Sequence, residues 1–153
     1  MSVPTIIIRG DRPDKVQMAM MMAYAAASRS TCARRTVVGK AVGCVIVTPD
    51  FTNVLSIGYN GPPRNVDTPC TLTPEVSGSC TCVHAEANAL IKSDYRPSYL
   101  VTTMSPCAAC ARLIINSAVE RVYYHEAYRD DTGLTLLHEA GIATINVALW
   151  AEA

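Results

Sequence analysis

Hydrophobic residues in this chain fall into short runs, separated by segments that contain Gly, Pro, Asp and Asn. β-Branched runs with turn residues between them predict strands, and Thr48-Pro49-Asp50 between two such runs predicts a β-hairpin. Segments of good helix-forming residues predict helices, with Pro106 near the start of one and Gly141 after the end of another. The predicted strands are residues 42–47, 54–59, 98–103, 121–125 and 142–149, and the predicted helices are residues 15–27, 83–92, 107–118 and 132–140.

The order of these elements predicts the fold class. After the hairpin, strands alternate with helices, which is typical of a three-layer α/β/α sandwich with a mixed central sheet, here of about five strands. The length of 153 residues suits one core, so residues 1–153 are expected to form a single domain. The helix at residues 15–27 is apolar almost all round and is expected to be buried. Residues 60–82 are expected to form a long loop, which usually has a function or is held by another group.

The chain has 13 basic and 13 acidic residues, so its formal net charge is zero. This balance argues against binding of long nucleic acids, which usually shows as a basic excess. The longest apolar run, residues 18–27, is shorter than the roughly 20 residues of a membrane-spanning helix, and the first residues lack the apolar centre of a secretory signal. We therefore expect a cytoplasmic protein without membrane contact. Seven cysteines in that reducing compartment indicate metal binding or reactive thiols rather than disulfides.

The strongest chemical pattern is a His-Ala-Glu sequence followed by a Cys-x-x-Cys pair, each at the start of a predicted helix. Cys107 and Cys110 are neighbours on one face of a first helical turn, where the helix dipole lowers the pKa of both thiols. Together with His84 they provide three ligands for zinc and leave its fourth position open for water, as in catalytic zinc sites. Glu86 is close enough in sequence to serve as the acid/base beside that water.

Each part of this pattern also has an ordinary structural interpretation. A Cys-x-x-Cys pair alone is typical of a redox pair or of half a structural zinc site, and a lone His on a helix is usually a core residue. The combination, in this order and at helix starts, is much more specific. It matches the H-x-E and P-C-x-x-C pattern of the zinc-dependent nucleobase deaminases.

Over roughly residues 14–147 the chain resembles the cytidine deaminase superfamily and, within it, the phage-type deoxycytidylate (dCMP) deaminases. The GYNG motif at residues 58–61 and the RSTC motif at residues 29–32 separate that family from tRNA adenosine and free-nucleoside deaminases better than the zinc motif does. A TVVGKA segment follows the RSTCARR motif, where many relatives are shorter. The matching motifs are RSTCARR at residues 29–35, VGCVIV at 42–47, GYNGPP at 58–63, HAEANA at 84–89 and SPCAAC at 105–110.

The resemblance implies zinc-dependent hydrolytic deamination of dCMP to dUMP and ammonia. In such an enzyme Glu86 moves protons from water to the cytosine ring and to the departing amine, and backbone N–H groups at helix starts face the base carbonyl. The residues that the resemblance assigns to the substrate are Ser30, Arg34, Asn60, Ala85 and Tyr128. Three of them also have an ordinary structural explanation, namely a turn at Asn60, a solvated basic helix end at Arg34 and packing of Tyr128.

Further cysteines surround the long loop. Several relatives hold a second, structural zinc between the N-terminal motif and the segment before the HAE motif. A closed four-thiolate site would explain how so long a loop keeps its shape, and the alternative is four unrelated reduced thiols. Cys44 lies in an apolar strand and is expected to be a small buried hydrophobe. The four candidate ligands are Cys32, Cys70, Cys80 and Cys82.

The resemblance also implies a homo-hexamer that dCTP activates and dTTP inhibits, with Mg²⁺ accompanying the regulatory nucleotide. The residues associated with this regulation are Gly58, Tyr59, Asn60 and Gly61. Two other functions stay open: a related deaminase that acts on another cytosine nucleotide or on tRNA adenosine, and a non-catalytic, zinc-stabilised nucleotide-binding module. The neutral charge argues against the first, and Glu86 argues against the second because binding alone does not need that acid.

Overall fold

The computed structural model of the chain describes residues 12–66, 70 and 80–149. Their strands form one mixed sheet in the order β2-β1-β3-β4-β5, in which β1 is antiparallel to β2 and β3, while β4 is parallel to β3 and β5. In chain order the elements are α1 (Lys15–Ala27), β1 (Gly43–Val47), β2 (Val54–Tyr59), α2 (Ala85–Lys92), β3 (Ser98–Met104), α3 (Ala108–Ile115), β4 (Val119–Glu126), α4 (Thr132–Glu139) and β5 (Ala143–Asn146).

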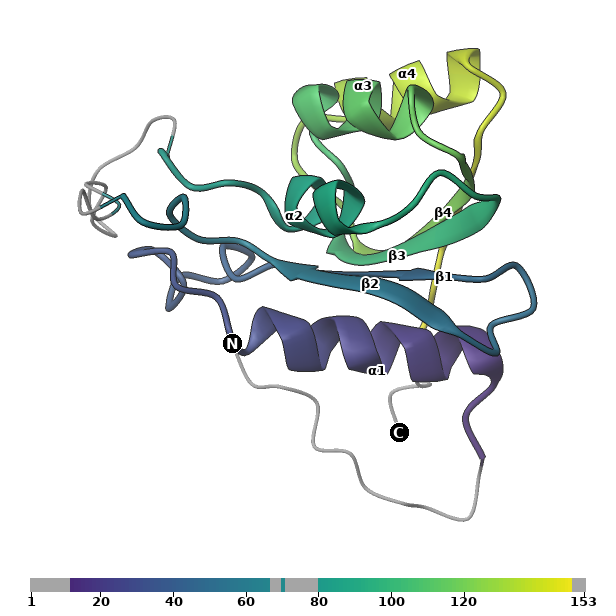
Figure 1. The fold of residues 1–153 in the computed structure, drawn as a ribbon, viewed down its shortest axis with the longest axis horizontal. Coiled ribbons are helices and arrows are strands. Elements are labelled where there is room, and N and C mark those ends of the chain that lie inside the picture. Colours follow the sequence, from purple (N-terminus) through teal and green to yellow (C-terminus); the bar gives the residue numbers. More distant parts are fainter. Residues whose placement is uncertain (1–11, 67–69, 71–79, 150–153) are drawn as a thin grey trace.

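Helices cover both faces of the sheet. Figure 1 shows α1 against one face and α2, α3 and α4 on the opposite side. Strand β1 is buried along its whole length because its alternating side chains enter two different cores: Val45 and Val47 pack on the α1 side, whereas Cys44 and Ile46 pack on the side of α2 and α3. This arrangement confirms the predicted three-layer α/β/α sandwich with a mixed five-stranded sheet, and it places Cys44 in the apolar core as expected.

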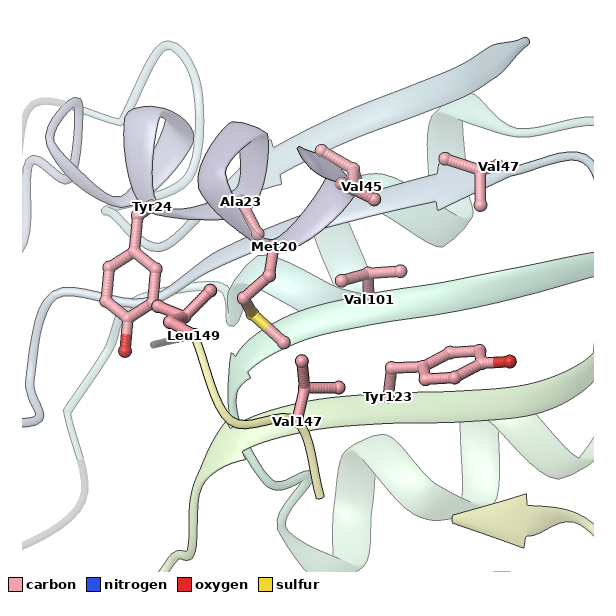
Figure 2. Packing of buried hydrophobic residues seen from close by; sticks show 10 residues of the cluster. Met20, Ala23, Tyr24, Val45, Val47, Val101, Tyr123, Val147 and Leu149 are labelled. Atoms are coloured by element: carbon pink, nitrogen blue, oxygen red, sulfur yellow. The ribbon is translucent and has the colours of Figure 1, made fainter. Parts of the chain in front are cut away.

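The core between α1 and the sheet brings distant parts of the chain together. Figure 2 shows Met20 between the strand residues Val101 and Tyr123 and the C-terminal segment that contains Val147. Met20 has no exposed surface, and its full burial contributes roughly 1.5–3 kcal/mol to folding. The Tyr24 hydroxyl and Nδ1 of His125 share a hydrogen bond, which ties α1 to the end of β4.

Helix α1 is buried where it packs against the sheet, as expected for so apolar a helix, but part of its opposite side is exposed. Its buried residues include Ala23 and Ala27, whereas Met18 is 43% exposed. Methionine and alanine are good helix formers whatever they face, and a sequence that is apolar on every side does not reveal which side meets the sheet.

Several boundaries differ from the sequence prediction for identifiable reasons. Helix α2 begins at Ala85 rather than at residue 83, because Val83 pairs with Gly61 through two backbone hydrogen bonds of 2.8 and 3.2 Å. Helix α3 begins one residue later than predicted, with Cys107 as its N-cap in an extended conformation. The last strand is only four residues long, and Leu149 beyond it packs on the α1 side of the sheet.

Gly58 explains why α2 lies so close to β2. A Cβ atom on this residue would lie 2.2 Å from the Ala85 carbonyl oxygen and 2.6 Å from the Ala89 nitrogen, so any side chain would push the helix away. Ser56 on the same strand donates a hydrogen bond of 2.7 Å to the Ala89 carbonyl. These contacts set the distance between α2 and the sheet. They therefore also set the position of the first residues of the helix.

Among the described residues, no helix combines the length and the apolar character that crossing a bilayer would require. The longest of them is α1, with 13 residues.

Candidate active site

Two helix starts meet at one end of the sheet and bring the HAE and Cys-x-x-Cys motifs together. His84 is the N-cap of α2 and Cys107 is the N-cap of α3, both with extended backbone angles. Neither side chain forms a capping hydrogen bond, so both are available to each other across the gap between the helices. Cys110 lies in the first turn of α3 and is almost completely buried.

The three side chains present a donor set that fits a zinc ion. His84 Nδ1 lies 3.5 Å from the Sγ atom of Cys107 and 3.4 Å from that of Cys110, and the three donor atoms all lie within 4.8 Å of one another. Two donors on a tetrahedral zinc, at bond lengths of about 2.3 Å for sulfur and 2.0–2.1 Å for nitrogen, are about 3.6 Å apart. The separations are therefore those of a zinc site with three protein ligands.

The two thiols differ in acidity, which the sequence did not predict. Hydrogen bonds from Cys110 and His84 lower the pKa of the Cys107 thiol to about 3. The hydrogen bond to Cys107 and burial raise the pKa of the Cys110 thiol, although a lowered pKa was expected for both. The hydrogen bond to Cys107 also raises the pKa of His84. Cys110 therefore gives up its proton only when a cation is provided, as is usual for metal-binding thiols.

Glu86 lies on the first turn of α2, beneath these donors. Its side chain is 4% exposed, and its Oε2 atom accepts a hydrogen bond of 3.8 Å from the Cys110 thiol. Burial is the main reason that the pKa of Glu86 is raised, to about 7. A carboxyl group with a pKa near neutrality can both accept and release a proton, which is what general acid/base chemistry requires.

A cavity of about 460 Å³ opens over these residues. Its floor includes His84, Glu86 and Cys107, and its walls come from parts of the chain that are far apart in sequence. Most of the predicted substrate residues line it, namely Arg34, Asn60, Ala85 and Tyr128. The structure thus gathers the proposed catalytic groups and most of the proposed substrate groups around one space.

Asn60 is held by the backbone around it. Its side-chain oxygen accepts a hydrogen bond of 3.0 Å from the Val42 N–H, and its Nδ2 group donates one of 2.7 Å to the Lys40 carbonyl. Ser30 lies behind Asn60 instead of at the cavity surface, and its hydroxyl donates a hydrogen bond of 3.0 Å to the Asn60 carbonyl. These bonds fix the segment around residue 60 against the TVVGKA segment.

Sequence reasoning missed two cationic residues of the cavity. Lys40 and Arg129 line it together with Arg34, whose Nε atom is buried and has no hydrogen-bond partner among the described residues. Among the described residues of the lining Glu86 is the only acidic one, whereas Arg34, Lys40 and Arg129 give the walls positive charge. Lys40 belongs to the TVVGKA segment, which lies outside the family motifs, and Arg129 is the residue after Tyr128. Nothing in the sequence around either residue distinguishes it from a solvated surface charge.

The four remaining loop cysteines form a second cluster. Their Sγ atoms all lie within 4.8 Å of one another, with 3.7 Å between Cys32 and Cys80 and 2.8 Å between Cys70 and Cys80. In the part of the chain that the structure describes, no cysteine forms a disulfide. Burial, followed by hydrogen bonding among the thiols, raises the pKa of Cys82. Sulfur atoms in a closed tetrahedral thiolate site are about 3.8 Å apart, which the Cys32–Cys80 separation matches, whereas Cys70 and Cys80 lie closer together.

Three of these cysteines, Cys32, Cys80 and Cys82, also line the cavity over Glu86. Of the four residues from Gly58 to Gly61, only Asn60 does so. Gly58 lies against α2, and a Cβ atom on Gly61 would lie 2.0 Å from the Thr31 hydroxyl oxygen.

The fold and the site together define a metal-site enzyme built on a mixed α/β sheet. Residues 13–126 match the family described as the cytidine and deoxycytidylate deaminase zinc-binding region. The chain therefore belongs to this deaminase family, which confirms the resemblance seen in its motifs.

Individual relatives agree with this assignment. The chain is 36% identical over 129 residues to the deoxycytidylate deaminase of Mycobacterium phage D29, and the aligned region covers 74% of this chain and 95% of that protein. It is 33% identical over 144 residues to the deoxycytidylate deaminase of Saccharomyces cerevisiae, which covers 86% of this chain but only 44% of the yeast protein. The crystal structure of dCMP deaminase from cyanophage S-TIM5, in complex with dCMP and dUMP, matches with a TM-score of 0.76 at 29% identity and covers 90% of this chain and 99% of that one.

Proposed function

We propose that this protein deaminates dCMP hydrolytically to dUMP and ammonia, with one zinc ion held by His84, Cys107 and Cys110. The observation that supports this most directly is the cavity itself. It joins a three-donor zinc set, a buried carboxyl group at Glu86 and a positively charged wall in one space. The relatives named above are called deoxycytidylate deaminases, and one of them was solved with dCMP and dUMP.

The proposed chemistry needs little from the chain besides proton transfer and positioning. The zinc ion, when bound, supplies Lewis-acid activation of a water molecule. Glu86 accepts a proton from that water and delivers it to N3 of the cytosine ring while the oxygen bonds to C4. Glu86 then takes the proton of the hydroxyl group now on C4 and passes it to the amine as the C4–N bond breaks, so that water and dCMP become dUMP and ammonia. A buried carboxyl group whose pKa is about 7 suits both steps.

The cavity walls suggest how the nucleotide is oriented. The backbone N–H of Ala85, at the start of α2, is available to the base carbonyl because the first N–H groups of a helix have no partner within it. Arg34, Lys40 and Arg129 form a cationic wall that suits the 5′-phosphate. Tyr128 lines the space between them and is proposed to contact the nucleotide.

The four loop cysteines are proposed to hold a second, structural zinc ion through Cys32, Cys70, Cys80 and Cys82. The sulfur separations and the raised pKa of Cys82 support this, because buried thiols are stable as thiolates only beside a cation. Such a site would fix residue 32 to the segment before the HAE motif and so keep one wall of the cavity in place. Metal analysis of purified protein should find two zinc ions per chain, and one zinc with four freely titrating extra thiols would contradict the second site.

Regulation, assembly and location belong to the same proposal and follow from the family resemblance. We propose a cytoplasmic homo-hexamer of single-domain chains, activated by dCTP and inhibited by dTTP in the presence of Mg²⁺. Residues 58–61 are the proposed regulatory segment. A monomer whose rate does not respond to either nucleotide would remove the regulatory part and leave the chemistry unaffected.

An ammonia-release assay tests the proposed reaction. The purified zinc-loaded protein is offered dCMP, CMP, deoxycytidine and a tRNA substrate, with and without dCTP or dTTP. We expect release from dCMP far above that from deoxycytidine, because only the nucleotide engages the cationic wall. Release from tRNA adenosine instead would indicate the related deaminase, and nucleotide binding without any release would indicate a binding module.

A further inference from the structure

The segment that follows β4 contributes one wall of the cavity and has no strand or helix of its own. Tyr128 and Arg129 lie on it and line the cavity. The pairing of β3 with β4 ends at Met104 and Glu126, so the backbone beyond Glu126 is outside the sheet. Something other than the sheet must therefore hold these two side chains in position.

Ser105 provides that connection. Its hydroxyl oxygen accepts a hydrogen bond of 2.6 Å from the Tyr128 N–H, and its own N–H donates one of 2.8 Å to the Glu126 carbonyl. Ser105 is 2% exposed and Tyr128 is half-buried, so this contact is partly shielded from water. Ser105 thus adds one hydrogen bond to the ladder after the strands themselves have separated.

A side chain is needed at this point for a physical reason. The next residue is Pro106, which has no N–H, and the chain then turns into α3, so the backbone after Ser105 cannot continue pairing with β4. An N–H that is partly buried and has no partner costs free energy, and the serine hydroxyl reduces that cost at Tyr128.

The same two segments approach each other a second time. Gly133, in the first turn of α4, lies so close to the loop before α3 that a Cβ atom on it would be 2.0 Å from the Pro106 carbonyl oxygen. Residues 126–133 are therefore held against residues 105–107 at both ends. Cys107 of this loop belongs to the zinc donor set, so the wall and the donor set are joined through one short stretch of chain.

We propose that Ser105 is a positioning residue: its hydroxyl holds the Tyr128 backbone, and thereby the Tyr128–Arg129 wall, at the correct distance from the metal donors. The inference rests on the proposed deamination of dCMP and extends it, because it assigns part of the alignment of the nucleotide to Ser105, which lines the cavity and acts through the Tyr128 backbone. Its effect is on substrate binding and not on the metal or on proton transfer by Glu86.

The test compares Ser105→Ala with Ser117→Ala. Ser117 is a matched control because its hydroxyl also accepts a backbone N–H, that of Val119 at 3.2 Å, yet it does not line the cavity. In Ser105→Ala we expect the KM for dCMP to rise roughly tenfold, with kcat and zinc content near those of the unaltered protein. Ser117→Ala should leave KM unchanged, and Ser105→Thr, which keeps the hydroxyl, should restore it.

A double-substitution cycle with Tyr128→Ala gives a second measurement. If Ser105 acts through the wall, Ser105→Ala should raise KM much less when Tyr128 is already Ala than when it is present. An unchanged KM in Ser105→Ala, fully additive effects, or loss of zinc or of the folded state in that variant would each overturn the proposal. These results are distinguishable from failure of the proposed function, since an unaltered protein that releases no ammonia from dCMP would overturn both.

Discussion

Glu86 is a buried acid that has no ion-pair partner among the described residues. Such burial costs folding free energy and is therefore unusual unless the acid takes part in a reaction. Glu86 is almost completely buried, and the only ion pair within the described part of the chain joins Arg96 to Asp94 and does not include it. Burying an acid without an ion pair favours its protonated form, which is why its pKa is raised to about 7. A perturbed acid inside a cavity beside a metal donor set is typical of an active site.

Replacing Glu86 by Gln should separate metal binding from turnover. The amide keeps the size of the side chain but cannot accept or release the proton, so we expect zinc to be retained and dCMP turnover to fall by roughly 10²–10⁴-fold. Zinc content and ammonia release measure the two properties on the same sample. Glu139→Gln, at the exposed end of α4, is the matched control and should behave like the unaltered protein. Substantial remaining activity in Glu86→Gln would reject its role.

Lys40 provides a residue-scale test of the cationic wall. Lys40→Met keeps most of the aliphatic stem and removes the charge, so kcat/KM for dCMP should fall roughly tenfold through loss of a charged hydrogen bond. The weaker reaction with deoxycytidine should change little, since that substrate has no phosphate. Arg35→Met serves as the control because Arg35 is exposed and does not line the cavity. An equal loss for both substrates would place Lys40 outside phosphate recognition.

At the scale of elements, the positions of α2, α3 and α4 decide where the site residues lie. His84 and Cys107 are N-caps, so each is placed by the helix that follows it. Gly58 sets the approach of α2 to the sheet, and Gly133 sets the approach of α4 to the loop that precedes α3. Larger side chains at Gly58 and Gly133 would push α2 away from the sheet and α4 away from the loop before α3.

Gly133→Ala should therefore weaken zinc binding at the candidate active site. Its new Cβ atom would lie 2.0 Å from the Pro106 carbonyl oxygen and 2.9 Å from the carbonyl group of Cys107, so the loop must shift. Changes that displace a ligand from outside its immediate shell commonly cost about 10–100-fold in metal affinity. Competition with a chromophoric chelator measures this loss. Thr135→Ala, an exposed substitution in the same helix, is the control, and equal affinity in the two variants would contradict the expectation.

The whole molecule is organised around a cavity whose walls come from separate parts of the chain. Residues near 32–42, 60, 80–86, 104–107 and 128–129 all contribute to its lining. Two of these stretches are connected by the four-cysteine cluster, because Cys32 is brought within 3.7 Å of Cys80. The cluster therefore affects the shape of the cavity, although its sulfurs lie outside the catalytic donor set.

Cys82→Ser should test this connection. We expect the zinc content to fall from two ions to one per chain, the melting temperature to decrease, and the KM for dCMP to rise because Cys82 lines the cavity wall. The remaining zinc should still support turnover at saturating dCMP. Cys44→Ala removes a buried sulfur outside both donor sets and should retain two zinc ions. Unchanged zinc content in Cys82→Ser would argue against a second metal site.

Much of the candidate site was predictable, because its chemistry depends on short spacings within single helix starts. His84, Glu86, Cys107 and Cys110 could be identified from residue types a few positions apart. Lys40 and Arg129 could not, because a cation in a loop has no spacing that distinguishes it from an ordinary surface charge. Ser105 belongs to the SPCAAC motif, but its contact with the backbone of Tyr128, 23 residues later, is seen only in the folded chain.

The sequence alone determined which groups are present and how each local segment folds. The alternation of strands and helices, the motif spacings and the zinc donors are all local properties, set by backbone preference and by the distance between nearby side chains. Only the tertiary structure decided which side of α1 is buried, how the two metal-site thiols differ in acidity, and which cations face the cavity. Those outcomes depend on burial and on contacts between segments separated by tens of residues, and such contacts exist only after the layers have packed.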